Sequence, residues 1–167
     1  MIHLLFTGGT ISMQRDAAAG GNIPAHGGEA LVAQVPGLER VGPYRIENWA
    51  KLPACHLGID RLWALRERVR AVAAAGEVRG IVITHGTDTM VDSAAAIAAA
   101  GIAKTIVLTG AMVPYAFGSS DGLFNLGSAL SFAQVLPDGV YVAMNGQYFT
   151  WDRVRKNRET GVFEETR

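Results

Sequence analysis

Short apolar runs alternate with helical patterns along this chain, and the alternation constrains its fold more than any other feature. Bounded by turn residues, these runs predict buried strands at Ile2–Thr7, Gly80–Thr84, Thr105–Thr109 and Val140–Met144, with a weaker candidate at Tyr44–Trp49. Strands that are apolar on both faces are typical of parallel sheets, because helices cover each side of such a sheet.

Helical patterns fill the segments between the strands. The clearest one, Asp60–Ala75, carries Leu65, Val69 and Val72 at helical spacing, with arginines on the opposite face. Further helices are predicted at Thr89–Ala100, at Gly122–Val135 and, as a short one, around Glu29–Gln34. This order of elements predicts an α/β fold, a three-layer sandwich with a central, mainly parallel sheet of the flavodoxin-like or Rossmann-like kind.

Two stretches show neither pattern. Met13–Gly28 is rich in glycine, alanine and polar residues, which predicts a hairpin or a flexible flap. Tyr148–Arg167 is polar and charged, and we expect it to be irregular. The length of 167 residues suits one domain, and no linker or internal repeat divides it, so residues 1–167 are expected to form a single domain.

Composition excludes several classes of function. Lysine plus arginine and aspartate plus glutamate each number 15, which argues against a nucleic-acid partner. The single cysteine, Cys55, cannot form an intrachain disulfide, and no cysteine–histidine cluster suggests a metal. Neither phosphate-binding glycine motif occurs, so no cofactor is expected. The apolar start, Met1–Phe6, is too short for a signal peptide, and no run is long enough to cross a membrane, so we expect a soluble, cytoplasmic protein.

The predicted strands deliver glycine and threonine to one edge of the sheet. Their carboxyl ends lead into Thr7-Gly8-Gly9-Thr10-Ile11, Thr84-His85-Gly86-Thr87-Asp88-Thr89 and Thr109-Gly110-Ala111-Met112. Ligands of open parallel sheets bind at this edge. Glycine lets the backbone approach a ligand closely, and its amide can receive an oxyanion.

Each polar residue at this edge also has a structural interpretation. Thr87 or Asp88 can cap the helix that follows, and Thr10 can be an ordinary turn residue. His85, between a strand and a glycine turn, is better explained as a hydrogen-bonded structural group than as a base. Lys156 lies in a run of charges, which is usually a solvated face.

Taken together, these motifs resemble those of bacterial L-asparaginases. The resemblance rests on the pair Thr7-Gly8-Gly9-Thr10-Ile11 and His85-Gly86-Thr87-Asp88-Thr89, each after a predicted strand. Gly110-Ala111-Met112, Ser120-Asp121-Gly122-Leu123-Phe124-Asn125 and Met144-Asn145 extend it along the chain. The chain is similar to the N-terminal domain of that family over its whole length.

The resemblance implies an amidohydrolase that acts on the side-chain amide of free asparagine. It implies that Thr10 is the nucleophile and forms an acyl intermediate, and that Thr87, Asp88 and Lys156 form a proton relay. Asp88 would also receive the substrate's α-ammonium group. Backbone amides at Gly86 and Thr87 would stabilise the oxyanion, and the Ala111 carbonyl would orient the leaving amide.

The chain departs from the family pattern in three places. The flap tyrosine that usually lies near the nucleophile is missing, since Asn22 stands in the comparable segment and the first tyrosine is Tyr44. The segment that usually binds the substrate carboxylate reads Cys55-His56, and a thiol is a weak donor, so His56 or backbone amides are expected to help. The family's usual C-terminal domain is not expected in this single-domain chain.

Two other functions stay open at this point. The first is a glutaminase or an amidotransferase component, whose substrate is longer by only one methylene, worth about 1–3 kcal/mol in a pocket. A non-catalytic module that binds an amino acid is the second alternative, since fold does not determine function. A homo-oligomer is expected in addition, because the helical segments Ala94–Ala100 and Gly122–Val135 are apolar and rich in small residues.

Overall fold

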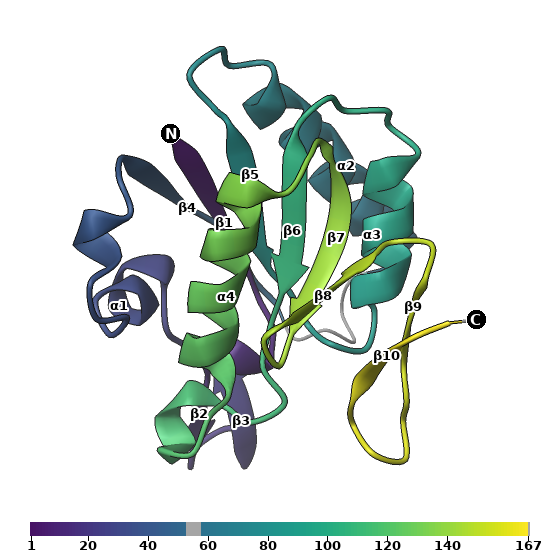
Figure 1. Cartoon of the computed structure of the whole chain (residues 1–167). Coiled ribbons are helices and arrows are strands. Elements are labelled where there is room, and N and C mark those ends of the chain that lie inside the picture. The colour runs from purple at the N-terminus through teal and green to yellow at the C-terminus, as the bar shows by residue number, and fades with distance from the viewer. Residues whose placement is uncertain (53–57, 167) are drawn as a thin grey trace.

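A single mixed sheet organises the molecule (Figure 1). The computed structural model describes residues 1–52 and 58–166, and in this part of the chain the sheet has the order β4-β1-β5-β6-β7-β8. Its strands are β1 (Ile2–Gly8), β4 (Tyr44–Leu52), β5 (Gly80–Thr84), β6 (Thr105–Thr109), β7 (Gly139–Met144) and β8 (Gln147–Thr150). All neighbours are parallel except β7 and β8, which form an antiparallel hairpin.

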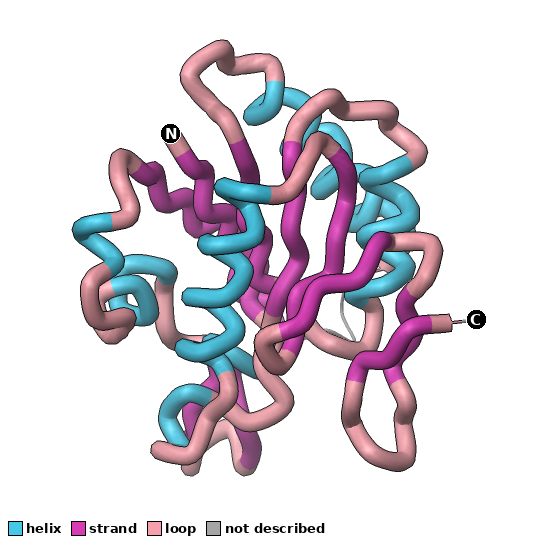
Figure 2. The backbone as a smooth tube through the Cα atoms, in the orientation of Figure 1, coloured by secondary structure: helices cyan, strands magenta, loops and turns pink. Residues whose placement is uncertain are grey.

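Helices cover both faces of the sheet (Figure 2). They are α1 (Gly28–Val32), α2 (Ile59–Ala73), α3 (Met90–Ala98) and α4 (Gly122–Val135). Helices α2 and α3 pack on one face and α1 and α4 on the other, each with its own buried apolar cluster. The three-layer α/β sandwich that the sequence predicts is therefore confirmed.

The side-chain alternation of the strands explains why both faces are apolar. In β5, Ile81 and Ile83 belong to the cluster beneath α2 and α3, whereas Val82 belongs to the cluster beneath α4. All three side chains are buried, with at most 1% of their surface exposed. Successive residues of a strand point to opposite faces, so a strand covered on both sides must be apolar throughout.

The predicted elements lie where the periodicity placed them, with end shifts of three residues or fewer. The remaining short elements are η1 (Thr10–Ser12), β2 (Met13–Asp16), β3 (Gly21–Pro24), η2 (Leu38–Arg40), η4 (Tyr115–Phe117), β9 (Val154–Lys156) and β10 (Phe163–Glu165). Strands β2 and β3 pair as the hairpin that was one of the two interpretations of Met13–Gly28.

The prediction that Tyr148–Arg167 is irregular is wrong. The segment completes β8 and forms the antiparallel pair β9–β10. Asn145 and Gly146 join β7 to β8 with φ of 55° and 75°, the positive values that a tight two-residue hairpin needs. The strands escape sequence reasoning because they are only three or four residues long, and most of their side chains are polar and at least partly exposed.

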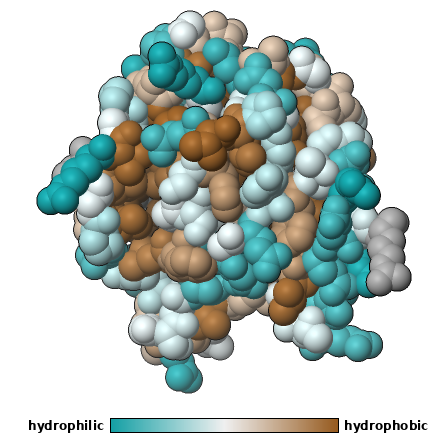
Figure 3. Space-filling model, viewed as in Figure 1, coloured by the Kyte–Doolittle hydropathy of each residue, from teal (hydrophilic) through white to brown (hydrophobic). Residues whose placement is uncertain are grey.

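The outer face of α4 is uncharged and exposes two large apolar side chains beside polar Ser131 and Gln134. Figure 3 shows hydrophobic residues gathered over this part of the molecule, and Phe124 and Val135 are 63% and 76% exposed. No residue of α4 carries a charge. Within residues 1–52 and 58–166, no helix combines the length and the hydropathy needed to cross a bilayer.

Gly80 allows α4 to pack directly on the start of β5. A Cβ atom at this position would lie 2.7 Å from the Ala133 carbonyl oxygen of α4 and 3.4 Å from the Thr105 carbonyl oxygen of β6. Both neighbours are backbone atoms, which cannot move aside as a flexible side chain can. The close approach of helix and sheet therefore depends on glycine at this position.

We expect Gly80→Ala to lower the free energy of unfolding by about 1–3 kcal/mol, because the added methyl group overpacks the contact between α4 and β5. Gly76→Ala is the matched control, since a Cβ atom there meets nothing within 4 Å. The control is expected to stay within about 0.5 kcal/mol of the wild type. Urea unfolding of the two variants measures both values, and equal stabilities would contradict the packing argument.

Candidate active site

Buried threonines fix the carboxyl edge of the sheet. Thr7 Oγ1 donates to the Thr84 carbonyl oxygen at 2.8 Å, and this bond links the ends of β1 and β5. Thr109 Oγ1 donates to the Ala143 carbonyl oxygen at 2.8 Å and links β6 to β7 in the same way. The loops that carry the predicted site residues therefore start from fixed points.

The first of these loops touches the second. Gly9 has φ of 79°, and a Cβ atom on it would lie 2.7 Å from the Gly86 nitrogen and 2.8 Å from the His85 carbonyl carbon. Contact this close is possible only without a side chain, which explains the glycine directly before Thr10. Thr10 follows directly as a partly buried residue at the start of η1. The backbone directly before Thr10 is thus in van der Waals contact with the backbone directly before Thr87.

Lys156 joins the second loop from a distant part of the sequence. Its Nζ lies 2.8 Å from Thr87 Oγ1 and 2.7 Å from Asp88 Oδ1. The Lys156 side chain is only 13% exposed, whereas that of Asp88 is 60% exposed. An ammonium group in this position donates to both oxygens, so the Thr87 hydroxyl hydrogen is free to point elsewhere. The carboxylate keeps an open side toward solvent.

Lys156 points into the protein although it belongs to a run of charged residues, and the side-chain alternation of β9 explains why. Val154, two residues earlier, is buried in the cluster beneath α3 together with Phe163 of β10. Residues two apart in a strand point to the same side, so Lys156 follows Val154 inward while Arg155 points outward to Glu164. The general rule that a charge run is a solvated face fails here for Lys156, whereas Arg153, Arg155 and Arg158 of the same run are exposed.

The helix-cap interpretation does not hold for Thr87 or Asp88. Helix α3 begins at Met90 with Thr89 as its N-cap residue, and the Thr89 side chain makes no capping hydrogen bond. Thr87 is buried and instead accepts from Lys156.

His85 is a structural group, as its place between a strand and a glycine turn suggests. Its Nδ1 lies 2.8 Å from the Gly86 carbonyl oxygen and its Nε2 lies 2.9 Å from Ser93 Oγ. A carbonyl only accepts, so Nδ1 carries the proton and Nε2 accepts from Ser93. Burial lowers the pKa of His85, although the hydrogen bond to Gly86 opposes the shift, and the neutral ring has both nitrogens satisfied.

The third loop is held by a polar cluster around Asn125. Asn125 is fully buried, and its Nδ2 donates to the Gly110 carbonyl oxygen at 2.9 Å and to Asp121 Oδ2 at 2.8 Å. Asp121 in turn accepts from the backbone nitrogens of Met112 and Val113 at 3.0 and 3.1 Å. The turn around Ala111, itself fully buried, is therefore fixed from both sides.

Sequence reasoning missed this function of Asp121 and Asn125. The sequence marks both residues as part of a motif shared with the family, and Asp121 as the residue before a helix, without a function for either side chain. The Asp121 side chain makes no cap bond to α4. Asn125 also accepts from the backbone nitrogen of Asn145 at 2.8 Å, which ties the β7–β8 turn to the same cluster. The sequence offered one signal for this function, an asparagine among the apolar residues on the inward face of a predicted helix, because a polar side chain that is buried there needs hydrogen-bond partners.

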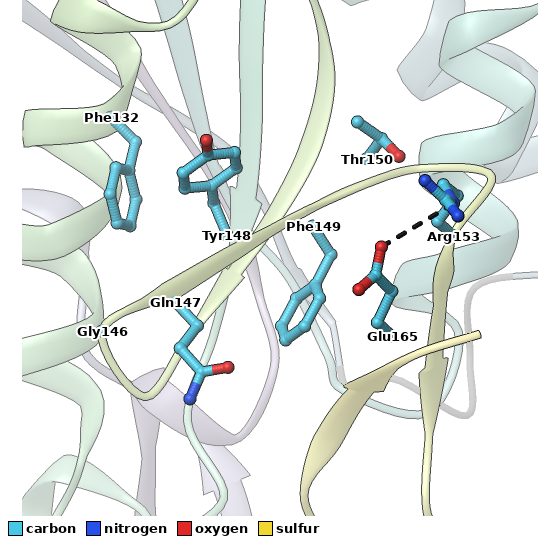
Figure 4. Close-up of a pocket in the computed structure, with 8 residues that line it drawn as sticks. All are labelled: Phe132, Gly146, Gln147, Tyr148, Phe149, Thr150, Arg153 and Glu165. Carbon is cyan, nitrogen blue, oxygen red and sulfur yellow. Dashed lines mark ion pairs between the residues drawn. The ribbon is translucent and has the colours of Figure 1, made fainter. Parts of the chain in front are cut away.

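Two predicted site residues, Cys55 and His56, lie outside the described residues. In the part of the chain that is described, no group of three or more histidine, cysteine, aspartate or glutamate side chains is arranged to hold a metal ion. A cavity of about 580 Å³ lies along β8, between Phe132 and Tyr148 on one side and the Arg153–Glu165 ion pair on the other (Figure 4). Its lining includes none of the predicted site residues.

Comparison with known proteins identifies the family. The family described as "Asparaginase, N-terminal" matches residues 1–163. The chain therefore belongs to the asparaginase family. The similar curated proteins include the glutaminase-asparaginase of Pseudomonas fluorescens biotype A, which is 34% identical over 98% of this chain and 48% of its own length. Another is a glutamyl-tRNA(Gln) amidotransferase subunit of Methanococcus vannielii, 31% identical over 87% of this chain and 34% of its own length.

Solved structures agree with this assignment. The thermostable L-asparaginase from Thermococcus kodakarensis superposes with a TM-score of 0.83 at 29% identity, over 98% of this chain and 50% of that one. A probable cytoplasmic L-asparaginase from Campylobacter jejuni gives a TM-score of 0.81 at 27% identity, over 98% of this chain and 51% of that one. The chain thus spans about half the length of the asparaginases it matches.

We expect the stability of the fold to decrease as the pH falls below 6.5, the ordinary pKa of histidine. The folded state holds the pKa of His85 below that value, so the unfolded chain binds its proton first. Each such histidine removes up to about 1.4 kcal/mol per pH unit until its folded-state pKa is reached. His3 contributes in the same direction, because burial also lowers its pKa.

Denaturant unfolding of the wild type and of His85→Gln at about pH 7.5 and about pH 5.5 measures this dependence. The variant should lose less stability between the two pH values, whatever its stability at the higher one. If the variant and the wild type lose the same stability between the two pH values, His85 does not titrate in this way.

Proposed function

We propose that this chain hydrolyses the side-chain amide of free L-asparagine to L-aspartate and ammonia, with Thr10 as nucleophile. The observation that carries the proposal is the Lys156–Thr87–Asp88 cluster beside the contact between Gly9 and Gly86. A lysine held against a threonine hydroxyl and a carboxylate suits proton transfer at a carbonyl centre. Membership of the asparaginase family agrees with this chemistry.

In the proposed reaction, Thr10 Oγ1 attacks the amide carbon and gives its proton to the Thr87 hydroxyl. Thr87, held in place by Lys156, passes a proton on to the amide nitrogen. Collapse of the tetrahedral intermediate breaks the C–N bond, releases ammonia and leaves an ester on Thr10. Water then attacks the ester, which yields aspartate and restores the threonine hydroxyl. Backbone amides at Gly86 and Thr87 would stabilise the oxyanion in both steps.

Substrate recognition is assigned to groups around the same edge. Asp88, with its carboxylate open to solvent, is proposed to bind the α-ammonium group. The Ala111 carbonyl, in the loop that Asn125 and Asp121 hold rigid, is proposed to orient the leaving amide. Cys55 and His56 stay the proposed partners of the α-carboxylate.

Glutamine is the competing substrate, since one relative is named a glutaminase-asparaginase and another belongs to an amidotransferase. The two amides differ by a methylene, which a pocket discriminates by about 1–3 kcal/mol. An assay of ammonia release distinguishes the candidates. Release from asparagine indicates an asparaginase, release from glutamine indicates a glutaminase, and release from neither indicates a module that only binds an amino acid.

We also propose that the protein is a cytoplasmic homo-oligomer. The uncharged outer face of α4, with Phe124 and Val135 exposed, supports self-association. Helix α3 gives less support to self-association, because its apolar residues Met90, Ala94 and Ile97 are buried against the sheet. The similarity to a probable cytoplasmic L-asparaginase supports the location.

Thr10→Ala is expected to lower kcat for asparagine by about 10³-fold or more, because it removes the nucleophile. Thr10→Ser keeps a hydroxyl at the same place and should retain measurable turnover. Both variants should unfold within about 1 kcal/mol of the wild type, since the side chain lies in a turn. Steady-state ammonia release decides the matter, and substantial activity of Thr10→Ala would rule out Thr10 as nucleophile.

Lys156→Met is expected to lower kcat by about 10²–10⁴-fold, the usual cost of losing a proton-transfer group. Arg155→Met is the matched control, because Arg155 is the neighbouring cation of the same strand, is exposed and pairs with half-buried Glu164. The control should keep wild-type kinetics. Equal kcat values for the two variants would contradict the relay.

A further inference from the structure

The β2–β3 hairpin is tied at its base to the turn that carries Thr10. The backbone nitrogens of Ala25 and His26 both donate to the Ser12 carbonyl oxygen, at 2.9 and 3.0 Å. Ser12 itself is bound back to the Gly9 carbonyl oxygen by its backbone nitrogen at 3.1 Å and by its Oγ at 2.9 Å. Any movement of the hairpin base is therefore transmitted to the Gly9–Ser12 turn.

The far part of the hairpin has little to hold it. Residues 17–22 are exposed, and Cβ atoms on Gly20 and Gly21 would meet nothing within 4 Å. The hairpin therefore depends on packing near its base, where β2 and η1 lie against η4.

His26 and Tyr115 make a specific contact at that place. Their ring centroids are 5.6 Å apart and the ring planes meet at 89°, the edge-to-face arrangement that aromatic pairs favour. His26 Nε2 is shielded from solvent and has no hydrogen-bond partner among the described residues. With no such bond at Nε2, the contact with Tyr115 helps to orient this side of the ring.

Tyr115 belongs to a segment that is itself rigid. Ser120 Oγ donates to the Val113 carbonyl oxygen at 2.6 Å, and the Asp121 carboxylate accepts from the backbone nitrogens of Met112 and Val113. The same carboxylate is bound to Asn125, which holds Gly110. Through Tyr115, the hairpin is therefore connected to the loop that carries Ala111.

We propose that His26 and Tyr115 are positioning residues, whose ring contact fixes the Thr10 turn relative to the Ala111 loop. The inference rests on the proposed function, in which Thr10 and the Ala111 carbonyl act on the same amide. Neither ring touches the reacting atoms. Loss of the contact should therefore lower kcat and leave KM nearly unchanged, since a misplaced nucleophile reacts slowly with substrate that still binds.

The activity test uses substitutions that remove or keep the rings. His26→Ala and Tyr115→Ala should each lower kcat roughly 10- to 100-fold, with KM within about threefold of the wild type. His26→Phe and Tyr115→Phe keep the ring contact and should be close to the wild type. The double alanine variant should be no worse than either single one, because both remove one interaction. Additive losses, or a His26→Phe variant as slow as His26→Ala, would overturn the proposal.

A second measurement does not depend on catalysis. Arg15, on the exposed side of β2, is a trypsin site whose cleavage requires the hairpin to open. Cleavage after Arg15, followed by mass spectrometry of the fragments, should be faster in both alanine variants and unchanged in both phenylalanine variants. Unchanged cleavage in the alanine variants would overturn the positioning role. A wild type that releases no ammonia would overturn the proposed function instead, and the cleavage rates alone would then decide whether the rings clamp the hairpin.

Discussion

The contact of Lys156 with Thr87 and Asp88 is the interaction on which the candidate site depends. It joins residues that are 69 and 68 positions apart, and it requires the β9–β10 pair to be docked against α3 through Val154 and Phe163. A partly buried ammonium group is costly unless it is paired, so Asp88 and Thr87 stabilise Lys156 as much as Lys156 orients them. Strands β9 and β10 are therefore part of the candidate site.

The same edge of the sheet is held by a second, uncharged set of bonds. Asn125 satisfies its side chain with Gly110, Asp121 and Asn145, and so connects α4 to the loops after β6 and β7. A fully satisfied buried network allows one arrangement only, because any displacement leaves a buried polar group unpaired. The loops after β1, β5 and β6 are thus held in three different ways. Gly9 makes a close backbone contact, Lys156 forms an ion pair, and the Asn125 side-chain amide forms hydrogen bonds.

The elements that sequence reasoning found and missed differ in length and burial. Strands such as Gly80–Thr84 and helices such as Gly122–Val135 were predicted because burial on a whole face imposes a periodicity. Strands β8, β9 and β10 were missed, since three or four half-exposed residues carry too little pattern. Thr10, Thr87, Asp88 and Lys156 are proposed as site residues from the resemblance to a family, whereas composition and spacing alone favoured structural explanations for them.

The sequence by itself determined the layers, the parallel sheet and the three glycine-bearing turns at its carboxyl edge. These follow from local patterns, because the spacing of apolar residues and the positions of glycine act over a few residues. Only the tertiary structure decided which polar side chains are inside. Lys156 points inward while Arg155 points outward, and Asp121 clamps a loop instead of capping its helix. The reason is that a long or charged side chain takes its environment from whatever distant segment packs against it, and no local pattern encodes that neighbour.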